Sequence, residues 1–320
     1  MDAARLVAWY DACARDLPWR DPGTTAWGVL VSEVMLQQTP VARVAPVWTG
    51  WMARWPRPSA LAAEPQGAVL RAWGKLGYPR RALRLHAAAT AIAADHGDVV
   101  PSDVDTLLAL PGIGAYTARA VAAFGFGARA AVVDTNVRRV VARAAHGAAG
   151  AGPPSTARDL SDVDALLPEH DAARFSAALM ELGAVVCTAG SPRCADCPVA
   201  GGCVWHRAGH PPATGSRRPA RPAQRFAGTD RQVRGRLLDV LRGAPCPVGR
   251  PQLDVVWADG VQRDRCLDSL LLDGLVQRCA DGRFALPGEA LPGEALPGEA
   301  LPGQPQGHSP ERRTLGAWPS

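Results

Sequence analysis

Four cysteines lie within 17 residues of one another and could hold a metal centre: their spacing is C-x6-C-x2-C-x5-C, at Cys187, Cys194, Cys197 and Cys203. Zinc sites built from four cysteines usually use two separated C-x2-C pairs, and this run has one. Thiolates also bind iron–sulfur clusters. The spacing therefore favours an iron–sulfur centre, leaves zinc open, and by itself implies only a structural role.

Glu33 and Asp134 are two acidic residues whose positions in the predicted structure need a physical explanation. Glu33 shares a helix face with the apolar residues Ala26, Val29 and Leu30, and burying a charge on such a face is costly unless the charge is paired or used. The same pattern also fits a Glu33 at the wet edge of the apolar stripe. Asp134 ends an apolar run and precedes a helix rich in valine and arginine, so we expect it to be the N-cap of that helix. A capping carboxylate remains available for chemistry.

A glycine-bearing turn separates two predicted helices at Leu110–Ala118 (LPGIGAYTA). Gly112 and Gly114 permit positive φ and close approach of a ligand to the backbone. The N–H groups that begin the helix over Tyr116–Phe124 would then form an anion site. An ordinary corner between two helices is the alternative.

These residues must be positioned by a mainly helical chain, because helix signals dominate and β-branched alternation is scarce. The residue pattern predicts helices over 3–13, 26–38, 40–54, 58–64, 66–75, 80–95, 102–109, 116–124, 135–145, 155–167 and 171–186. Ser102, with Asp105 three residues later, resembles a capping box at the start of the helix before the glycine turn.

The C-terminal part divides differently. Residues 206–226 are rich in proline and arginine and predict a basic linker. Short helices over 231–242, 251–258 and 261–272, followed by a hairpin with an Asp-Gly turn, predict a small winged-helix-like α+β domain over 227–285. The repeat LPGEA places proline at every fifth residue, so residues 286–320 are expected to form a disordered tail.

Composition and charge limit the cellular location and the binding partners that we expect for this protein. The 320-residue chain carries a net charge of +5 with a pI of about 8.9, which is compatible with a nucleic-acid partner. No run of about 20 apolar residues and no secretory signal is present, so we expect a cytoplasmic, nucleoid-associated protein without a membrane partner. In that compartment a disulfide framework is not expected. We also expect a monomer. Lys75 is the only lysine, so any chemistry that needs a lysine amine has one candidate.

Four motifs in order carry a family resemblance. They are Arg15–Arg20 (RDLPWR) with Ser32–Thr39 (SEVMLQQT), then Trp73–Tyr78 (WGKLGY), then the glycine turn, and then Val133–Val137 (VDTNV) followed by the four cysteines. Over about residues 5–205 the chain resembles the endonuclease III superfamily of helix–hairpin–helix DNA glycosylases, and within it the adenine DNA glycosylase (MutY) family. The resemblance implies a two-lobed helical fold over residues 1–205, a [4Fe–4S] cluster on the four cysteines, and double-stranded DNA with a mispaired adenine as the partner.

The resemblance also implies catalytic roles. Glu33 matches the general acid that protonates the adenine leaving group, with a pKa raised by apolar surroundings. Asp134 matches the carboxylate that stabilises the cationic sugar or captures it covalently, as in glycoside hydrolysis. Asn136 would hold Asp134 and the incoming water or a DNA phosphate. Tyr116 stands where strand-cleaving relatives carry a lysine, which implies a monofunctional glycosylase without significant lyase activity.

Binding roles follow from the same comparison. Gly112 and Gly114 match a backbone grip on DNA phosphate, and Gln38 and Tyr78 match residues that enter the base stack while adenine is flipped out. A further group matches the wall of the adenine pocket: Arg15, Leu17, Trp19 and Arg20. From the residues alone, Gln38 is a polar helix end, and Trp19 and Tyr78 are core side chains.

The chain departs from the family at three points. Thr135 replaces a usual glycine, Pro79 replaces an aromatic residue, and the usual Nudix-like domain that reads 8-oxoguanine is replaced by the winged-helix-like domain. We expect the basic linker or that domain to clasp DNA through phosphate contacts instead. The expected reaction is excision of adenine opposite 8-oxoguanine or guanine in base excision repair. The alternatives are a thymine glycosylase acting on G:T mismatches and a catalytically inert iron–sulfur DNA-binding protein.

Overall fold

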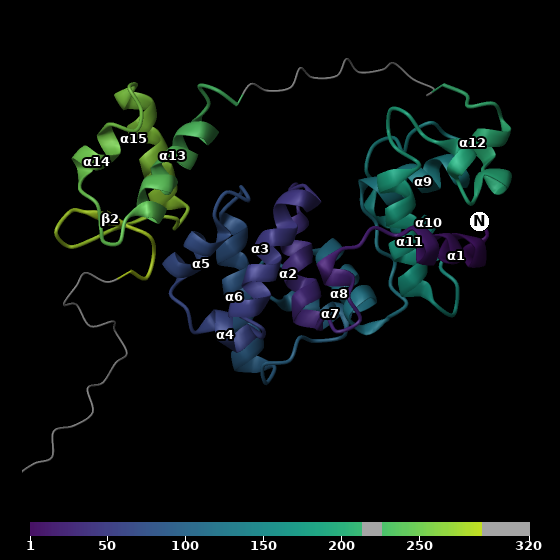
Figure 1. Cartoon of the computed structure of the whole chain (residues 1–320), viewed down its shortest axis with the longest axis horizontal. Helices are drawn as coiled ribbons and strands as arrows, with labels where there is room; N and C mark the ends of the chain where they lie inside the picture. Colours follow the sequence, from purple (N-terminus) through teal and green to yellow (C-terminus); the bar gives the residue numbers. More distant parts are fainter. Residues whose placement is uncertain (213–225, 290–320) are drawn as a thin grey trace, which may run out of the picture. The chain divides into compact units, whose positions relative to one another are not determined.

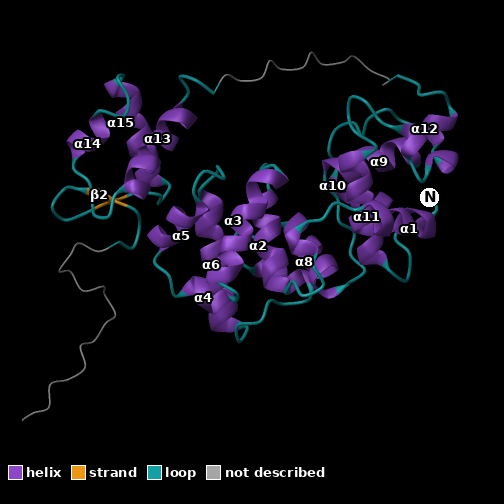
Figure 2. Ribbon diagram, viewed as in Figure 1, coloured by secondary structure: helices purple, strands orange, loops and turns teal. Residues whose placement is uncertain are grey.

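The computed structural model describes residues 1–212 and 226–289. Helices make up almost all of the regular structure, and the only strands in those two ranges are β1 (Gln277–Arg278) and β2 (Phe284–Ala285) (Figure 2). The prediction of a mainly helical chain is therefore confirmed. In the same ranges, no helix is both long enough and apolar enough to cross a membrane.

The first lobe contains the helices between residues 26 and 126 (Figure 1). Its core is built on tryptophans, with the Trp51 ring edge-on to Trp55 at 4.8 Å and to Trp73 at 5.6 Å between centroids. α2 and α8 pack against each other, so residues of these two helices lie side by side. The helices of this lobe are α2 (Ala26–Leu36), α3 (Val41–Arg54), α4 (Pro58–Ala62), α5 (Gln66–Trp73), α6 (Arg80–Asp95), α7 (Val104–Ala109) and α8 (Ala115–Phe126).

The second lobe combines the chain's first helix with its later ones, because α1 packs against α11 and α11 packs against α9. A separate apolar core, which includes Leu6, Val140 and Phe175, holds these helices together. The helices of this lobe are α1 (Ala3–Cys13), α9 (Thr135–Ala144), α10 (Thr156–Asp164), α11 (Ala172–Val185) and α12 (Val204–Arg207). Two helical lobes, with α8 of the first packed against α11 of the second, agree with the predicted fold.

The start of α7 differs from its prediction. Asp103, not Ser102, is the N-cap, and its carboxylate accepts a hydrogen bond from the Thr106 N–H at 2.8 Å. The capping residue of a helix must bond the N–H two or three positions later, and Ser102 lies one residue too early to reach that position.

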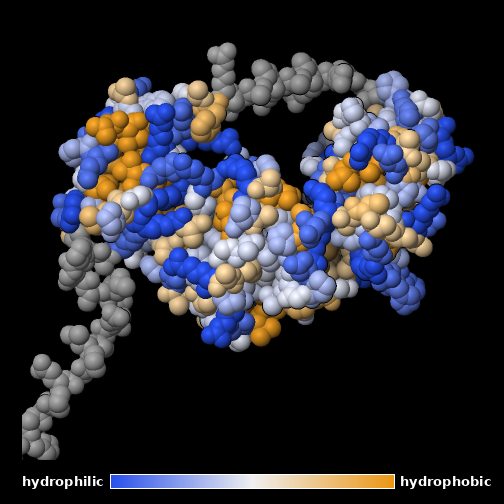
Figure 3. Space-filling view, viewed as in Figure 1, coloured by the Kyte–Doolittle hydropathy of each residue, from blue (hydrophilic) through white to orange (hydrophobic). Residues whose placement is uncertain are grey.

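The C-terminal domain, residues 227–289, contains α13 (Asp230–Gly243), α14 (Arg250–Asp254) and α15 (Gly260–Leu272), followed by the antiparallel pair β1–β2. Val248 adds a bridge to Phe284, so the segment between α13 and α14 joins the small sheet. α14 ends at Asp254, before the predicted end at 258, and α15 begins after Asp259, its N-cap, whose own backbone is extended. Figure 3 shows hydrophobic surface in the region of α14 and α15. Val255, directly after α14, and Val261 and Leu272, on α15, are largely exposed.

The predicted boundaries need two corrections. Residues 286–289 are packed, not disordered: Leu286 is fully buried, and Glu289 accepts two hydrogen bonds from the Arg71 guanidinium at 2.8 and 2.9 Å. The proline content of the repeat predicted disorder, but it does not show whether a leucine or a glutamate of the repeat contacts another part of the chain. His206 and Arg207, placed in the predicted linker, lie within α12. Residues 213–225 and 290–320, on which the remaining linker and tail predictions fall, lie outside the described residues.

Candidate active site and cysteine loop

Glu33 lies inside the first lobe on α2 with 7% of its surface exposed. Its pKa is raised to about 7. Burial is the largest cause; a side-chain hydrogen bond from Tyr116 and the Arg20 charge lower the pKa, and the Asp134 charge raises it. Loss of hydration disfavours the ionised carboxylate more than the hydrogen bond favours it. The prediction of a buried carboxyl with a raised pKa is confirmed, and the wet-edge alternative is wrong. Near neutral pH this group can donate a proton.

Tyr116, on the first turn of α8, is the polar neighbour of Glu33. Burial and the charges of Glu33 and Asp134 raise the pKa of Tyr116 well above its ordinary value of 10.0. The phenol therefore stays neutral and can only donate or accept hydrogen bonds. The chain's single lysine, Lys75, lies at the surface with 83% of its side chain exposed and pairs with Asp239. No lysine amine is thus available at this site.

Asp134 is the N-cap of α9, as predicted. Its Oδ1 accepts the Val137 N–H at 2.7 Å, and its Oδ2 accepts a hydrogen bond from Asn136 Nδ2 at 2.8 Å. The Asp134 charge raises the pKa of both Glu33 and Tyr116, so side chains from α2, α8 and the start of α9 lie close enough to interact at one site. In the sequence, Glu33 lies about a hundred positions before Asp134 and about eighty before Tyr116.

A chain of hydrogen bonds leads from Asn136 to the cysteine loop. Arg139 Nη2 donates to Asn136 Oδ1 at 2.8 Å and to the Gly183 carbonyl at 2.6 Å, and its Nε donates to the Cys187 carbonyl at 2.7 Å. A Cβ at Gly183 would lie 2.7 Å from Asn136 Cβ, so glycine is needed for α11 to approach α9 this closely. One guanidinium thus fixes both the amide of Asn136 and the start of the cysteine loop.

The arginines predicted for the adenine-pocket wall meet at Glu181, a residue that the sequence reasoning missed. Arg15 Nε donates to Glu181 Oε1 at 2.6 Å, and the Nη2 atoms of Arg15 and Arg20 donate to Oε2 at 2.8 and 2.9 Å. Burial opposes ionisation of Glu181, but these bonds outweigh it and hold its pKa at about 2. The available signal was an acidic residue within an apolar helix, the same signal that identified Glu33.

Leu17 and Trp19 lie between these arginines in the sequence and point into the core of the first lobe. They are 7% and 8% exposed, and the Trp19 ring lies edge-on to Trp48 at 6.0 Å between centroids. The core-packing interpretation of Trp19 therefore holds in this structure, and a role beside adenine stays a prediction.

Gln38 and Tyr78 share an unusual backbone. Both are exposed, and their φ angles are +56° and +48°, a region that residues other than glycine seldom adopt. The buried Arg81 fixes both turns, since its Nη2 donates to Thr39 Oγ1 at 2.9 Å and to the Gly77 carbonyl at 3.0 Å. Such conformations collect at functional sites, where the surrounding structure maintains them. The core-packing interpretation of Tyr78 is wrong, because 45% of its surface is exposed.

In the glycine turn, Gly112 uses the positive φ that glycine permits and Gly114, with φ −97°, does not; close approach of a ligand to this turn stays a prediction. Gly112 has φ +74°, and a Cβ there would lie 2.6 Å from Arg84 Cβ. Gly114 is the exposed N-cap of α8 and provides no side chain to cap the helix. An anion can therefore take the place of a capping side chain.

The four cysteines line one small hollow that is partly open to solvent. Burial raises the pKa of Cys197 to about 11, and the charges of Cys187, Cys203 and Cys194 oppose its ionisation further. Four thiolates need a cationic centre to coexist here, which fits an iron–sulfur cluster. The buried Arg143 supports them, because its Nη1 donates to Cys187 Sγ at 3.3 Å.

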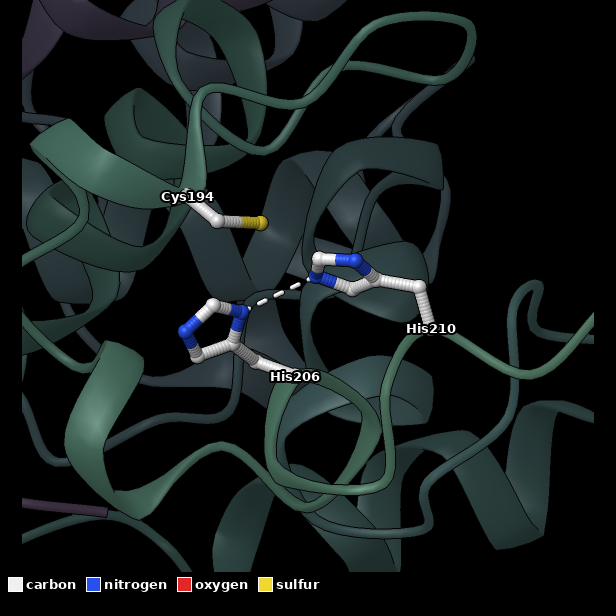
Figure 4. Close-up of side chains that lie close together, drawn as sticks. All are labelled: Cys194, His206 and His210. Atoms are coloured by element: carbon white, nitrogen blue, oxygen red, sulfur yellow. Dashed lines mark hydrogen bonds between the residues drawn. The ribbon is translucent and has the colours of Figure 1, made fainter.

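His206 lines this hollow, and His210 lies next to it. Figure 4 shows His206 and His210 joined by a hydrogen bond of 2.9 Å, with the Cys194 thiol beside them. The donor atoms of these three residues lie within 4.8 Å of one another, which is close enough for a metal ion. Cys194 cannot serve both arrangements, and its three sister cysteines line the same hollow, so the four-cysteine set accounts for it better.

Two family models match this chain, one over the region that contains the carboxylates and one over the cysteine loop. Residues 31–163 match the HhH-GPD superfamily of base excision DNA repair proteins, and residues 187–203 match the iron–sulfur binding domain of endonuclease III. The first match includes Glu33, Tyr116 and Asp134, and the second begins and ends at a cysteine of the loop.

Similar proteins extend these matches. An adenine DNA glycosylase of Mycolicibacterium smegmatis is 65% identical over 286 residues, which cover 89% of this chain and 95% of that protein. The human adenine DNA glycosylase is 43% identical over 205 residues, 61% of this chain and 37% of that protein. A solved thermostable thymine-DNA glycosylase is 25% identical, with a TM-score of 0.59, and covers 64% of this chain and 95% of its own. The mycobacterial match is too long to end before the C-terminal domain, so that domain is shared with that relative.

Proposed function

This chain belongs to the adenine DNA glycosylase family of the helix–hairpin–helix superfamily, and we propose that it hydrolyses the N-glycosidic bond of adenine opposite 8-oxoguanine or guanine in DNA. It binds DNA and acts in base excision repair, and its four cysteines hold a [4Fe–4S] cluster. One observation carries the proposal: a buried carboxyl, Glu33, has a pKa of about 7 beside a second carboxylate, Asp134.

We assign Glu33 as the general acid. It transfers its proton to the flipped adenine as the bond between the sugar C1′ and the base nitrogen breaks, and the bonding electron pair leaves with the base. Tyr116, neutral and hydrogen-bonded to Glu33, orients the acid. Without this protonation the base would leave as an anion, which is a poor leaving group.

We assign Asp134 as the carboxylate that stabilises the positive charge on the sugar. Asn136 and the Val137 N–H fix both of its oxygens, so the carboxylate needs little reorganisation as charge develops at C1′. A water molecule then adds to C1′ and gives a proton to Asp134 or solvent, which leaves an abasic site. Hydrolysis also follows if Asp134 first bonds to C1′ and water displaces it.

The absence of a lysine at the site supports a monofunctional enzyme. Strand cleavage through a Schiff base needs an amine that attacks C1′. Tyr116 has no amine, and Lys75 is engaged at the surface with Asp239. The product is therefore an intact strand with an abasic site.

DNA binding is assigned to three features. The Gly112–Gly114 turn presents the start of α8 to a phosphate. Gln38 and Tyr78 enter the base stack from their exposed, positive-φ turns while adenine leaves it. Arg15 and Arg20, fixed by Glu181, form the wall of the pocket that receives the base.

The [4Fe–4S] cluster supplies a compact charged framework that holds residues 187–203 together. Arg143 and Arg139 contact the Cys187 side chain and carbonyl, respectively, so the loop stays attached to α9, the helix that Asp134 caps.

The deciding experiment is a single panel of duplex substrates. Purified protein should release adenine from A:8-oxoG and A:G duplexes and no thymine from a T:G duplex. Release of thymine would favour the rival activity that the similarity to a thymine-DNA glycosylase suggests. Binding without any base release would favour an inert DNA-binding protein.

A further inference from the structure

The C-terminal domain contacts Tyr78 directly. Arg231, on the first turn of α13, donates a hydrogen bond from Nη2 to the Tyr78 hydroxyl at 2.7 Å, and its guanidinium carbon lies 5.0 Å from the centre of the Tyr78 ring. The Arg81 guanidinium lies 5.7 Å from the same ring. Two cations therefore hold one exposed aromatic ring, although Arg231 and Tyr78 are 153 positions apart.

Charged pairs attach this domain next to the Tyr78 turn. On the first lobe the partners are basic and on the C-terminal domain they are acidic: Lys75 with Asp239 at 3.5 Å, Arg80 with Asp273 at 3.2 Å, and Arg71 with Glu289 at 2.8 Å. Lys75 and Arg80 bracket Tyr78 in the sequence. The contact at Tyr78 is thus part of a broader attachment.

The attachment also uses backbone groups. The Gly67 N–H donates to the Pro287 carbonyl at 2.7 Å, and Arg242 Nε donates to the Leu70 carbonyl at 3.1 Å. A Cβ at Gly67 would lie 2.7 Å from the Glu289 side chain, so the two surfaces approach as closely as glycine allows. These contacts fix α5 to the C-terminal domain and with it the turn that follows α5.

We propose that Arg231 is a positioning residue through which the C-terminal domain holds the Tyr78 ring ready to enter the duplex beside the flipped adenine. The inference rests on the proposed function, in which Tyr78 enters the base stack. An exposed tyrosine on a positive-φ turn would otherwise sample many side-chain positions, and ordering it on DNA binding would cost affinity. The C-terminal domain therefore takes part in recognition of the mispair without contacting the bases.

The test is a double-mutant cycle on the full chain. Affinity for an A:8-oxoG duplex is measured by fluorescence anisotropy with the Glu33→Gln substitution present throughout, so that the substrate stays intact. Arg231→Ala should weaken binding by about two- to tenfold, the cost of ordering one side chain when the duplex binds. In a Tyr78→Ala protein the same substitution should have no further effect.

A spectroscopic measurement tests positioning directly. A 2-aminopurine placed next to 8-oxoguanine should brighten on binding as Tyr78 unstacks it, and Arg231→Ala should suppress that brightening. Arg236→Ala is the matched control, because Arg236 is an exposed arginine on the same helix that lies over Trp257. The control should keep both affinity and brightening, and all variants should keep the wild-type melting temperature.

Other results would overturn the inference. An equal loss of affinity on the Tyr78→Ala background, with a weaker dependence on salt, would mean that Arg231 binds a phosphate directly. Unchanged affinity and brightening in Arg231→Ala would remove the role altogether. The cycle measures binding, so it remains informative if the wild-type protein releases no adenine, which would instead overturn the proposed function.

Discussion

Asn136 donates a hydrogen bond to Asp134 across 2.8 Å, and the two residues are fixed further by the helix that Asp134 caps and by Arg139. A capping carboxylate is usually explained by helix stability alone. Here it also lies close enough to Glu33 and Tyr116 to shift the pKa of both. The contacts that cap the helix therefore also hold the Asp134 carboxylate in one orientation for chemistry.

The first prediction concerns pH. Glu33 must be protonated to act as the acid, and its pKa is about 7. The single-turnover rate of adenine release should therefore be high below pH 7 and should fall about tenfold for each pH unit above it. A rate that stays constant between about pH 7 and pH 9 would mean that proton donation by Glu33 does not limit the reaction.

The second prediction concerns Glu181. Because its folded pKa is lowered to about 2, the stability it provides is present above the usual value of 4.5 and is lost as pH falls through 2. Glu181→Gln should lower the free energy of unfolding by about 1–3 kcal/mol at neutral pH, by leaving Arg15 and Arg20 without their carboxylate. Urea denaturation measures this change.

Asp164→Asn is the matched control for Glu181→Gln. Asp164 pairs with Arg129 at the surface, where both side chains are about half exposed, so its loss should cost less than about 1 kcal/mol. Equal effects of the two substitutions would show that burial adds nothing to the Glu181 cluster.

The third prediction concerns the cysteine loop. Arg143→Met removes a buried guanidinium that donates to Cys187 Sγ, so the thiolates lose a compensating charge. The purified variant should contain less iron and show weaker broad visible absorbance than the wild type. Arg193→Ala, which removes an exposed arginine from the same loop, should retain its iron, and full iron content in both variants would contradict the role of Arg143.

The fourth prediction concerns reaction type. The wild-type protein should form no adduct with DNA that borohydride can trap, because no amine reaches C1′. Tyr116→Lys supplies that amine and should give a trapped adduct and strand cleavage. A trapped adduct with the wild-type protein would show that another amine reaches the sugar.

Local pattern was sufficient for part of this account. The helices, the Asp134 cap and the cysteine set follow from periodicity, capping chemistry and spacing, which act within a few residues. Periodicity singled out Glu33 but left it at either the buried face or the wet edge of its helix, and the family resemblance supplied its role. Glu181 and Arg231 could not be assigned from pattern, because their partners Arg15 and Tyr78 lie 166 and 153 positions away. Only the folded chain brings such groups together. The positive φ of Gln38 likewise depends on a turn held by the distant Arg81.

The most direct measurement compares wild-type protein with Glu33→Gln on an A:8-oxoG duplex under single-turnover conditions near pH 7. Glutamine keeps the size and polarity of the side chain but cannot protonate the base, so adenine release should fall by about a hundredfold or more while duplex affinity stays within about twofold. Adenine release at the wild-type rate by Glu33→Gln would contradict the central claim that the buried carboxyl of Glu33 drives the reaction.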